Sequence, residues 1–262
     1  MDSRMLALLA AVAWSGVSWA QAPQKDDPTA TRTGLELGIQ GSSYKYEEPN
    51  FAKLEGDRIG VTGTFTYVGP DLWYSRFEGR YSYGKLDYTG SGTLSNVPDQ
   101  LLDVRALAGK DYPAWGVVWS PYVGVGVRFL HNDLRGTSST GAIGYRRESR
   151  YFYFPLGFTM RIGMGGGWVF APQLEYEAFA NGNQRTYLGD VDPSLADVNN
   201  DQRKGYGNRG RLALEHGAWT FAAWFEYWNI RDSEIQPIGG GVALLEPANS
   251  TKEYGVELRY RF

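Results

Sequence analysis

A regular alternation of apolar and polar residues runs through most of the chain. At its end, Tyr254, Val256, Leu258, Tyr260 and Phe262 are apolar or aromatic, and the residues between them are glycine or charged. A period of two is typical of a β-strand with one apolar and one polar face. The pattern recurs in the stretches 34–41, 58–67, 72–84, 101–109, 121–129, 151–163, 168–179, 208–216, 219–228 and 253–262. We therefore predict an all-β protein of about ten strands, whose apolar faces cover either a core or lipid.

The segments that join these stretches alternate strictly between short and long. The short ones are 68–71, 110–116, 163–167 and 216–218, and the long polar ones are 42–56, 85–100, 131–149, 181–207 and 231–251. A chain that passes up and down through a membrane has short turns on the periplasmic side and long loops outside. Greek-key sandwiches mix the two lengths at both ends. The alternation favours a single up-and-down antiparallel transmembrane β-barrel, with both chain termini on the short-turn side.

The composition narrows the chemistry further. The chain has 262 residues, a net charge of -3, no cysteine and two histidines, His131 and His216. No basic run indicates a nucleic-acid partner, and the lack of cysteine excludes disulfides, thiolate metal sites and a cysteine nucleophile. A mean hydropathy of -0.40 excludes a helical membrane bundle. It agrees with a barrel, because half of each barrel strand is polar.

The N-terminal stretch predicts a secretory signal. An apolar run too short to span a bilayer follows Arg4, and Ser18 and Ala20 are small residues with the spacing of a cleavage site after Ala20. The expected divisions are a signal peptide at 1–20, a polar periplasmic lead at 21–33 and an outer-membrane β-barrel at 34–262. The mature chain is then exported, and its own strands hold it in the membrane.

Together these features resemble the outer-membrane β-barrel proteins of Gram-negative bacteria. In that family the last strand carries aromatic and apolar residues at every second position up to a terminal phenylalanine, and the barrel-assembly machinery recognises it. Tyr254, Val256, Leu258, Tyr260 and Phe262 match this assembly signal. The resemblance covers 34–262. It implies a cell outer-membrane location, contact with membrane lipid and lipopolysaccharide, and the assembly machinery as a partner during biogenesis. We expect a monomer.

Charged residues on the polar faces of the predicted strands would point into the barrel. The cations there are arginines, whose planar fork bonds carboxylates bidentately and is weakly hydrated. The signs nearly balance, and about ten strands enclose little more than their own side chains. We predict a lumen largely filled by a salt-bridge network, which is structural or lines a narrow selective path. Its expected members are Arg58, Arg76, Glu78, Arg80, Asp103, Arg105, Arg128, Arg161, Glu175, Glu177, Arg209, Arg211, Glu226, Glu257 and Arg259.

Two classes of enzyme occur among small outer-membrane barrels. Omptin proteases resemble this chain in size and carry an Asp-x-His pair with a second acidic pair at the outer rim, and lipid A deacylases of the outer membrane carry a His-x-Ser arrangement. Neither His131 nor His216 has an aspartate two residues before it or a serine two residues after it. We therefore expect no catalytic residue, no cofactor and no metal site.

Two features leave alternatives open. The long segment 181–205 gathers four aspartates, which are Asp190, Asp192, Asp197 and Asp201. A solvated acidic loop is one interpretation and a calcium site the other, although the EF-hand spacing of glycine and glutamate fails. Pro155 and Pro172 lie inside neighbouring predicted strands, where each removes a ladder donor. They mark either a bulge or non-bonded position, or a seam through which a lipid or apolar solute passes laterally.

The predicted function follows from the fold rather than from a motif. We expect an integral outer-membrane β-barrel protein, non-enzymatic, with a structural or surface-loop binding role and a largely plugged, charged lumen. The alternative is a narrow porin-like channel for small solutes. The second alternative is an outer-membrane enzyme, a protease or a lipid A-modifying enzyme.

Overall fold

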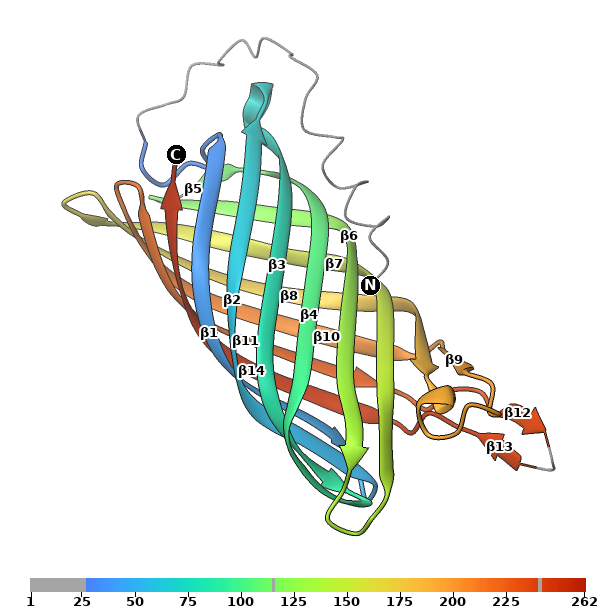
Figure 1. The fold of residues 1–262 in the computed structure, drawn as a ribbon. Helices are drawn as coiled ribbons and strands as arrows, with labels where there is room; N and C mark the ends of the chain where they lie inside the picture. The colour runs from blue at the N-terminus through green and yellow to red at the C-terminus, as the bar shows by residue number, and fades with distance from the viewer. Residues whose placement is uncertain (1–26, 115, 240–241) are drawn as a thin grey trace, which may run out of the picture.

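The computed structural model describes residues 27–114, 116–239 and 242–262, and the predicted signal peptide, 1–20, lies outside them. The described chain forms one closed β-barrel (Figure 1). Ten antiparallel strands make its wall. They are β1 (Gly34–Glu48), β2 (Ala52–Val68), β3 (Trp73–Gly90), β4 (Gly92–Lys110), β6 (Val117–Thr137), β7 (Ile143–Gly165), β8 (Trp168–Thr186), β10 (Gly205–His216), β11 (Trp219–Ile230) and β14 (Asn249–Arg261). Each wall strand pairs with the next along the chain, and the β14–β1 ladder closes the circuit. The predicted up-and-down barrel is confirmed.

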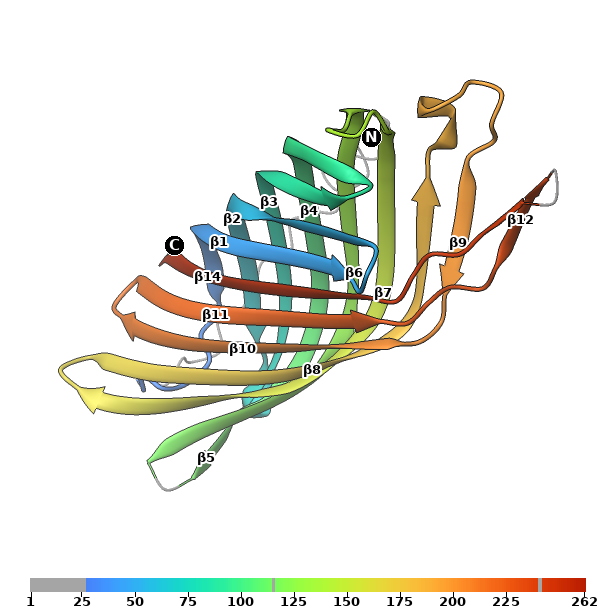
Figure 2. The ribbon, with the colours of Figure 1, turned by 90° about the horizontal axis from the view of Figure 1, so that it is seen from below.

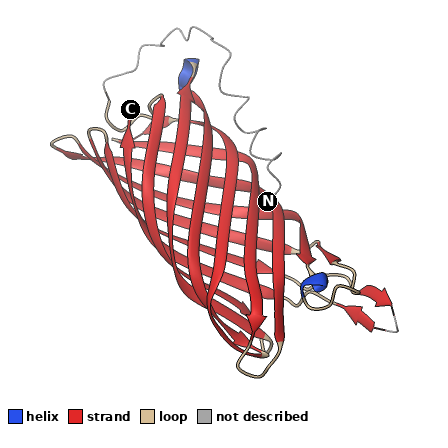
Figure 3. Ribbon diagram, in the orientation of Figure 1, coloured by secondary structure: helices blue, strands red, loops and turns tan. Residues whose placement is uncertain are grey.

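The remaining elements are short and lie at the two ends of the barrel. They are η1 (Pro70–Leu72), β5 (Tyr112–Ala114), η2 (Leu188–Asp190), β9 (Val198–Gln202), β12 (Gln236–Gly239) and β13 (Val242–Leu244). β12 and β13 form a separate hairpin that projects beyond the wall, beside β9 (Figures 1 and 2). Most of the described chain is β-strand, as Figure 3 shows. Among the described residues, no helix is long and apolar enough to cross a membrane.

The outer surface of the wall is apolar because the alternation in sequence becomes an alternation of faces. Along β2, Ile59 and Val61 are 73% and 56% exposed, whereas the neighbouring Arg58, which points into the barrel, is 1% exposed. Leu156 on β7 and Val256 on β14 are likewise 58% and 64% exposed. A soluble fold would not leave these side chains in water, so the exterior is suited to lipid.

Short turns gather at one end of the barrel, where the C-terminus also lies (Figure 1). The β10–β11 connection is only two residues long and uses Gly217 at φ 58°, a backbone conformation that glycine adopts without strain. The β7–β8 turn does the same with Gly166, also at φ 58°. Phe262 extends the last strand, and its backbone N–H donates to the carbonyl of Leu35 at 2.9 Å.

The opposite end of the barrel differs from the expectation of five long loops. The predicted loops 42–56, 85–100 and 131–149 are wrong, because β1 through β7 continue as strands and are joined only by 49–51, by Ser91 and by 138–142. Beyond the lipid-facing band the outward side chains meet water and need not be apolar, so the alternation that marks a strand in sequence disappears while the backbone ladder continues. Long connections remain only at 187–204 and 231–248.

Pro155 and Pro172 interrupt ladders without shifting them. The β6–β7 ladder has no pair at Phe154 or Pro155, yet its register is the same on either side. The β7–β8 ladder skips Ala171 and Pro172 in the same way. Each proline remains paired with the strand on its other side. The register shifts of β7–β8 lie elsewhere, so neither proline marks a bulge.

Candidate functional site in the barrel interior

The strands place charged side chains inside the barrel at every second position. On β3, for example, Arg76 is 9% exposed and Phe77 is 57% exposed. Every member of the predicted lumen network lies on a wall strand and makes at least one ion pair. The interior therefore brings together the residues that the sequence pattern assigned to it.

Deep in the lumen, carboxylates are shared among several guanidinium groups. Glu226 accepts from Arg128 at 2.7 Å and from Arg209 at 2.6 Å, and it also contacts Arg80. Asp103 accepts from Arg209 at 2.7 Å. Because Asp103 and Glu226 lie on β4 and β11, the bridges cross the lumen and tie opposite walls together. Charge-assisted hydrogen bonds of this kind are strong in a dry interior.

Arg58 is one of the most completely enclosed members of the network. Its guanidinium contacts Asp99 and lies 3.6 Å from Glu253. It stacks over the Tyr44 ring at 3.3 Å from the ring centre. Glu253 also accepts from Ser42 at 2.7 Å. Asp99 was missed from sequence because it lies in a segment predicted as a loop, although it shares the odd-numbered inward positions of the residues that follow it on β4.

A second group of ion pairs lies nearer the short-turn end. Arg105 bridges Glu78 at 2.6 Å and Glu175 at 2.5 Å. Arg211 and Arg259 share one carboxylate, Glu257, at 2.5 and 2.8 Å. Looser pairs, at 3.8 and 3.9 Å, join Arg76 to Glu78 and Arg161 to Glu215.

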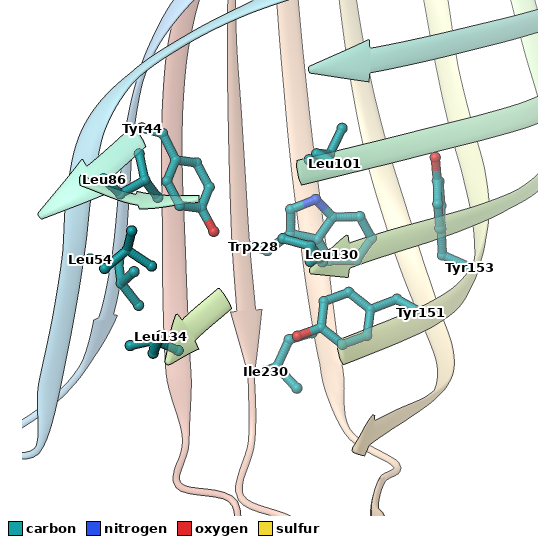
Figure 4. Close-up of a cluster of buried hydrophobic side chains, with 11 residues drawn as sticks. Tyr44, Leu54, Leu86, Leu101, Leu130, Leu134, Tyr151, Tyr153, Trp228 and Ile230 are labelled. Carbon is teal, nitrogen blue, oxygen red and sulfur yellow. The ribbon is translucent and has the colours of Figure 1, made fainter. Parts of the chain in front are cut away.

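The half of the lumen away from the short turns also contains an apolar cluster that the sequence pattern did not reveal. Figure 4 shows its side chains meeting inside the wall. Its members are Tyr44, Leu54, Leu86, Val97, Leu101, Leu130, Leu134, Tyr151, Tyr153, Trp228 and Ile230. Trp228 is 1% exposed and packs against Tyr153, with ring centres 5.2 Å apart. The charged network and this apolar cluster therefore share the interior: Arg58 lies over Tyr44 and Arg128 over Trp228, both members of the cluster.

Inward-facing glycines make room for the large inward rings. Tyr153 lies directly across the β6–β7 ladder from Gly126, and a Cβ added there would overlap the ring. Trp228 lies across from Gly207 in the same way, with ring atoms 2.9 Å from such a Cβ. These cross-strand pairs of glycine with an aromatic residue let a narrow barrel hold bulky side chains without widening.

The described part of the polar lead, 27–33, packs against the short-turn end of the lumen. The backbone N–H and the hydroxyl of Thr31 donate to the carboxylate of Asp111 at 2.7 and 2.8 Å. Ser120 donates to the same carboxylate at 2.6 Å, and Arg161 donates to the Thr31 hydroxyl at 3.0 Å. Between this lead and the charged network lies a cavity of about 90 Å³, lined largely by arginines and glutamates. That volume is enough for a few waters.

The two histidines have different partners. His131 lies on β6 with its Nδ1 3.4 Å from Glu148. His216 stacks on Trp168 at the short-turn end, with ring centres 4.6 Å apart. Within residues 27–114, 116–239 and 242–262, no group of three or more His, Cys, Asp or Glu side chains is arranged to hold a metal ion.

The aspartates of 181–205 are separately engaged. Asp190 takes a bidentate bond from Arg146 at 2.8 Å, and Asp197 pairs with Arg185 at 2.9 Å. Asp192 accepts from Ser194 and Asp201 from Asn183. The four carboxylates therefore face different partners rather than one common point.

No protein-family model and no curated protein matches the sequence. Among solved structures, the outer membrane protease OmpT from Escherichia coli aligns with a TM-score of 0.51 at 9% identity, over 90% of this chain and 100% of OmpT. The beta domain of the Bordetella autotransporter BrkA aligns at 0.45 and 13% identity, over 87% and 100%. The attachment invasion locus protein Ail of Yersinia pestis aligns at 0.36 and 8% identity, over 88% and 100%. The chain has the fold of the outer-membrane β-barrels. At these identities the likeness extends to the fold alone.

Proposed function

We propose that the protein is an integral barrel of a bacterial outer membrane that conducts no solute and acts at its outer end, without catalysis. The apolar exterior and the fold of its structural neighbours support the location. One observation carries the sealed lumen: a buried apolar cluster and a cross-linked charged network pack against each other in the same interior. A solute would have to displace both.

The exposure of the apolar row on the last strand supports its role as an assembly signal. Tyr254 and Val256 are 61% and 64% exposed on the outer surface of β14, and Phe262, directly after β14, is 71% exposed. Tyr260 packs edge-on against Trp219, with ring centres 4.9 Å apart. Assembly machinery could therefore reach this row before the barrel closes. Deletion of Phe262 should lower the fraction of chain recovered as folded barrel in outer-membrane fractions, whereas unchanged recovery would contradict its role as an assembly signal.

Swelling of vesicles tests the sealed lumen. Liposomes that contain the mature protein should swell in arabinose no faster than protein-free liposomes, while liposomes with a general porin swell rapidly. Swelling at a porin-like rate would contradict the proposal.

A narrow solute path is the second candidate, and the cavity of about 90 Å³ behind the polar lead favours it. In this alternative the lead and the looser Arg76 and Arg161 pairs form a mouth, and the apolar cluster is a gate that opens. Truncation of a side chain in the cluster should then increase swelling in small solutes. Under the sealed-lumen proposal, the same truncation lowers the stability of the barrel before it increases swelling.

A further inference from the structure

The outer end of the barrel carries a pocket of about 370 Å³ above the apolar cluster. Its floor includes Leu134 of that cluster and two residues packed against it, Tyr88 and Leu94. One wall is polar and contains Glu48 at the end of β1 together with Arg147 on β7. A concave, mostly apolar site with a few converging polar groups is the usual form of a small-molecule site.

The polar wall holds two carboxylates and one guanidinium. Arg147 Nη2 donates to Glu48 Oε1 at 2.8 Å and also contacts Glu246 Oε1. The Tyr46 hydroxyl lies 2.7 Å from Glu48 Oε1 and 3.3 Å from Glu246 Oε1. Glu48 and Glu246 are only 7% and 6% exposed, so both are largely removed from water.

The fold fixes Glu246 at this position although it lies in a long connection. Its backbone N–H donates to the Ser233 hydroxyl at 2.9 Å, and its carbonyl accepts from the Ser233 backbone N–H at 3.0 Å. Asn200 on β9 donates to the same hydroxyl at 3.2 Å and to the carbonyl of Leu244 at 3.3 Å. The outgoing and returning segments of the connection 231–248 are therefore held together at Ser233 and Glu246, and the Glu246 side chain is held beside Arg147.

The charges at this wall do not balance. With both carboxylates ionised, one guanidinium leaves a net charge of minus one in a buried site, which is costly unless a cation compensates it. All the described hydrogen bonds to Glu48 and Glu246 are made to Oε1, so the Oε2 atoms remain available to a donor. Burial raises the pKa of Glu246 to about 7. The positive charge of Arg147 lowers this pKa, and the negative charge of Glu48 raises it.

We propose that this pocket binds a small organic cation with an apolar body. Its ammonium or guanidinium group would lie between Glu48 and Glu246, and its apolar part over Leu94 and Leu134. The inference rests on the proposed role at the outer end, but not on a sealed lumen, which vesicle swelling tests separately.

Binding of such a cation is coupled to a proton. The groups that face Glu246 are Arg147 and Tyr145 of β7 and Glu48 and Tyr46 of β1. The side chains of Arg147, Tyr145 and Tyr46 do not change charge near neutral pH, whereas that of Glu246 does. A cation favours the ionised form of Glu246, so binding releases a proton below about pH 7. Affinity should therefore fall about tenfold between pH 8 and pH 6, as the ionised fraction falls from about nine tenths to about one tenth.

Calorimetric titration of the full mature chain in detergent micelles tests the proposal with three probes of one shape. They are 2-phenylethylammonium, the neutral 2-phenylethanol and the anionic 3-phenylpropanoate. We expect saturable binding of the ammonium only, with a heat that depends on the ionisation enthalpy of the buffer at pH 7. Equal binding of the alcohol would show partition into micelle or apolar surface and would overturn the cation site, as would saturable binding of the carboxylate.

A pair of variants separates this site from general surface charge. Glu246→Gln removes the charge but keeps the shape, and it should weaken ammonium binding at pH 8 by about tenfold or more, since hydrogen bonds to charged groups contribute most. Glu55→Gln makes the same change at an exposed acid of the outer end and should leave binding unchanged. Equal effects of both variants, or none from Glu246→Gln, would overturn the proposal even if vesicle swelling shows a sealed lumen.

Discussion

Replacement of Arg58 by methionine tests whether the buried network stabilises the barrel. Methionine keeps much of the volume, so the change mainly removes the guanidinium from Asp99 and Glu253, both of which are fully buried. A carboxylate left without its buried partner costs about 3–5 kcal/mol. Loss of the stacking on Tyr44, at 3.3 Å, adds about 1–2 kcal/mol. Glu253 keeps its bond from Ser42, which limits the total.

The free energy of unfolding is measured by urea titration in lipid vesicles, followed by tryptophan fluorescence. We expect Arg58→Met to lower it by about 4–7 kcal/mol, and the bond from Ser42 to Glu253 favours the lower end of that range. The double variant with Asp99→Asn should lose less than the sum of the two single variants, because the second change removes the stranded charge. Arg135→Met is the matched control: its pair with Asp133 at 2.6 Å is exposed, and its loss should cost about 1 kcal/mol or less. Strict additivity, or a cost at Arg58 no larger than at Arg135, would refute the reasoning.

Three further predictions use the same titration. Gly126→Val should lower the free energy of unfolding by about 1–3 kcal/mol because the new side chain collides with Tyr153. Gly63→Ala, whose Cβ meets only Leu37 at 3.6 Å, should be nearly neutral. Equal effects of the two variants would contradict the pairing of glycine with inward rings. Leu101→Ala, at a fully buried position, should cost about 2–5 kcal/mol, and a negligible cost would show that the cluster is loosely packed. Raising the pH from 4.5 to 7 should destabilise the fold by up to about 3 kcal/mol through Glu246. The pKa of Glu246 is raised from 4.5 to about 7 in the folded protein, so the unfolded chain loses this proton first as the pH rises. Glu246→Gln should remove that dependence.

The barrel itself could be predicted from sequence because lipid imposes a strict rule on the strands. Every second residue in the band must be apolar, as Ile59 and Val61 on β2 show, and the rule leaves a period of two that survives in the sequence. The inward charges follow from the same parity. Arg58 and Asp103 could therefore be assigned to the interior without any knowledge of their partners.

The outer parts of the strands could not be predicted in this way. Past the lipid band, Tyr44, Leu54 and Leu86 point inward while their neighbours on the other face meet water, and the surrounding segments are rich in polar residues and glycine. Turn and strand then look alike in composition. The cluster members Tyr44, Leu54, Leu86, Val97 and Leu134 were missed for this reason, although they continue the inward parity of the charged positions on the same strands.

Contacts between distant segments were also beyond the sequence pattern. Glu48, Arg147 and Glu246 come together only because β1 and β7 continue past the predicted strands and the segment after β13 passes beside them. The docking of Thr31 on Asp111 likewise joins residues 80 positions apart. No local periodicity reports such pairs, since they depend on closure of the wall.

Single-channel recording in planar bilayers tests the central claim most directly, because the claim is that the apolar cluster and the charged network seal the lumen. The purified mature barrel should insert without producing steady open levels in 1 M KCl at moderate voltage, and Leu101→Ala should not create them. Long-lived openings of uniform, porin-like conductance from the unmodified protein would contradict the account.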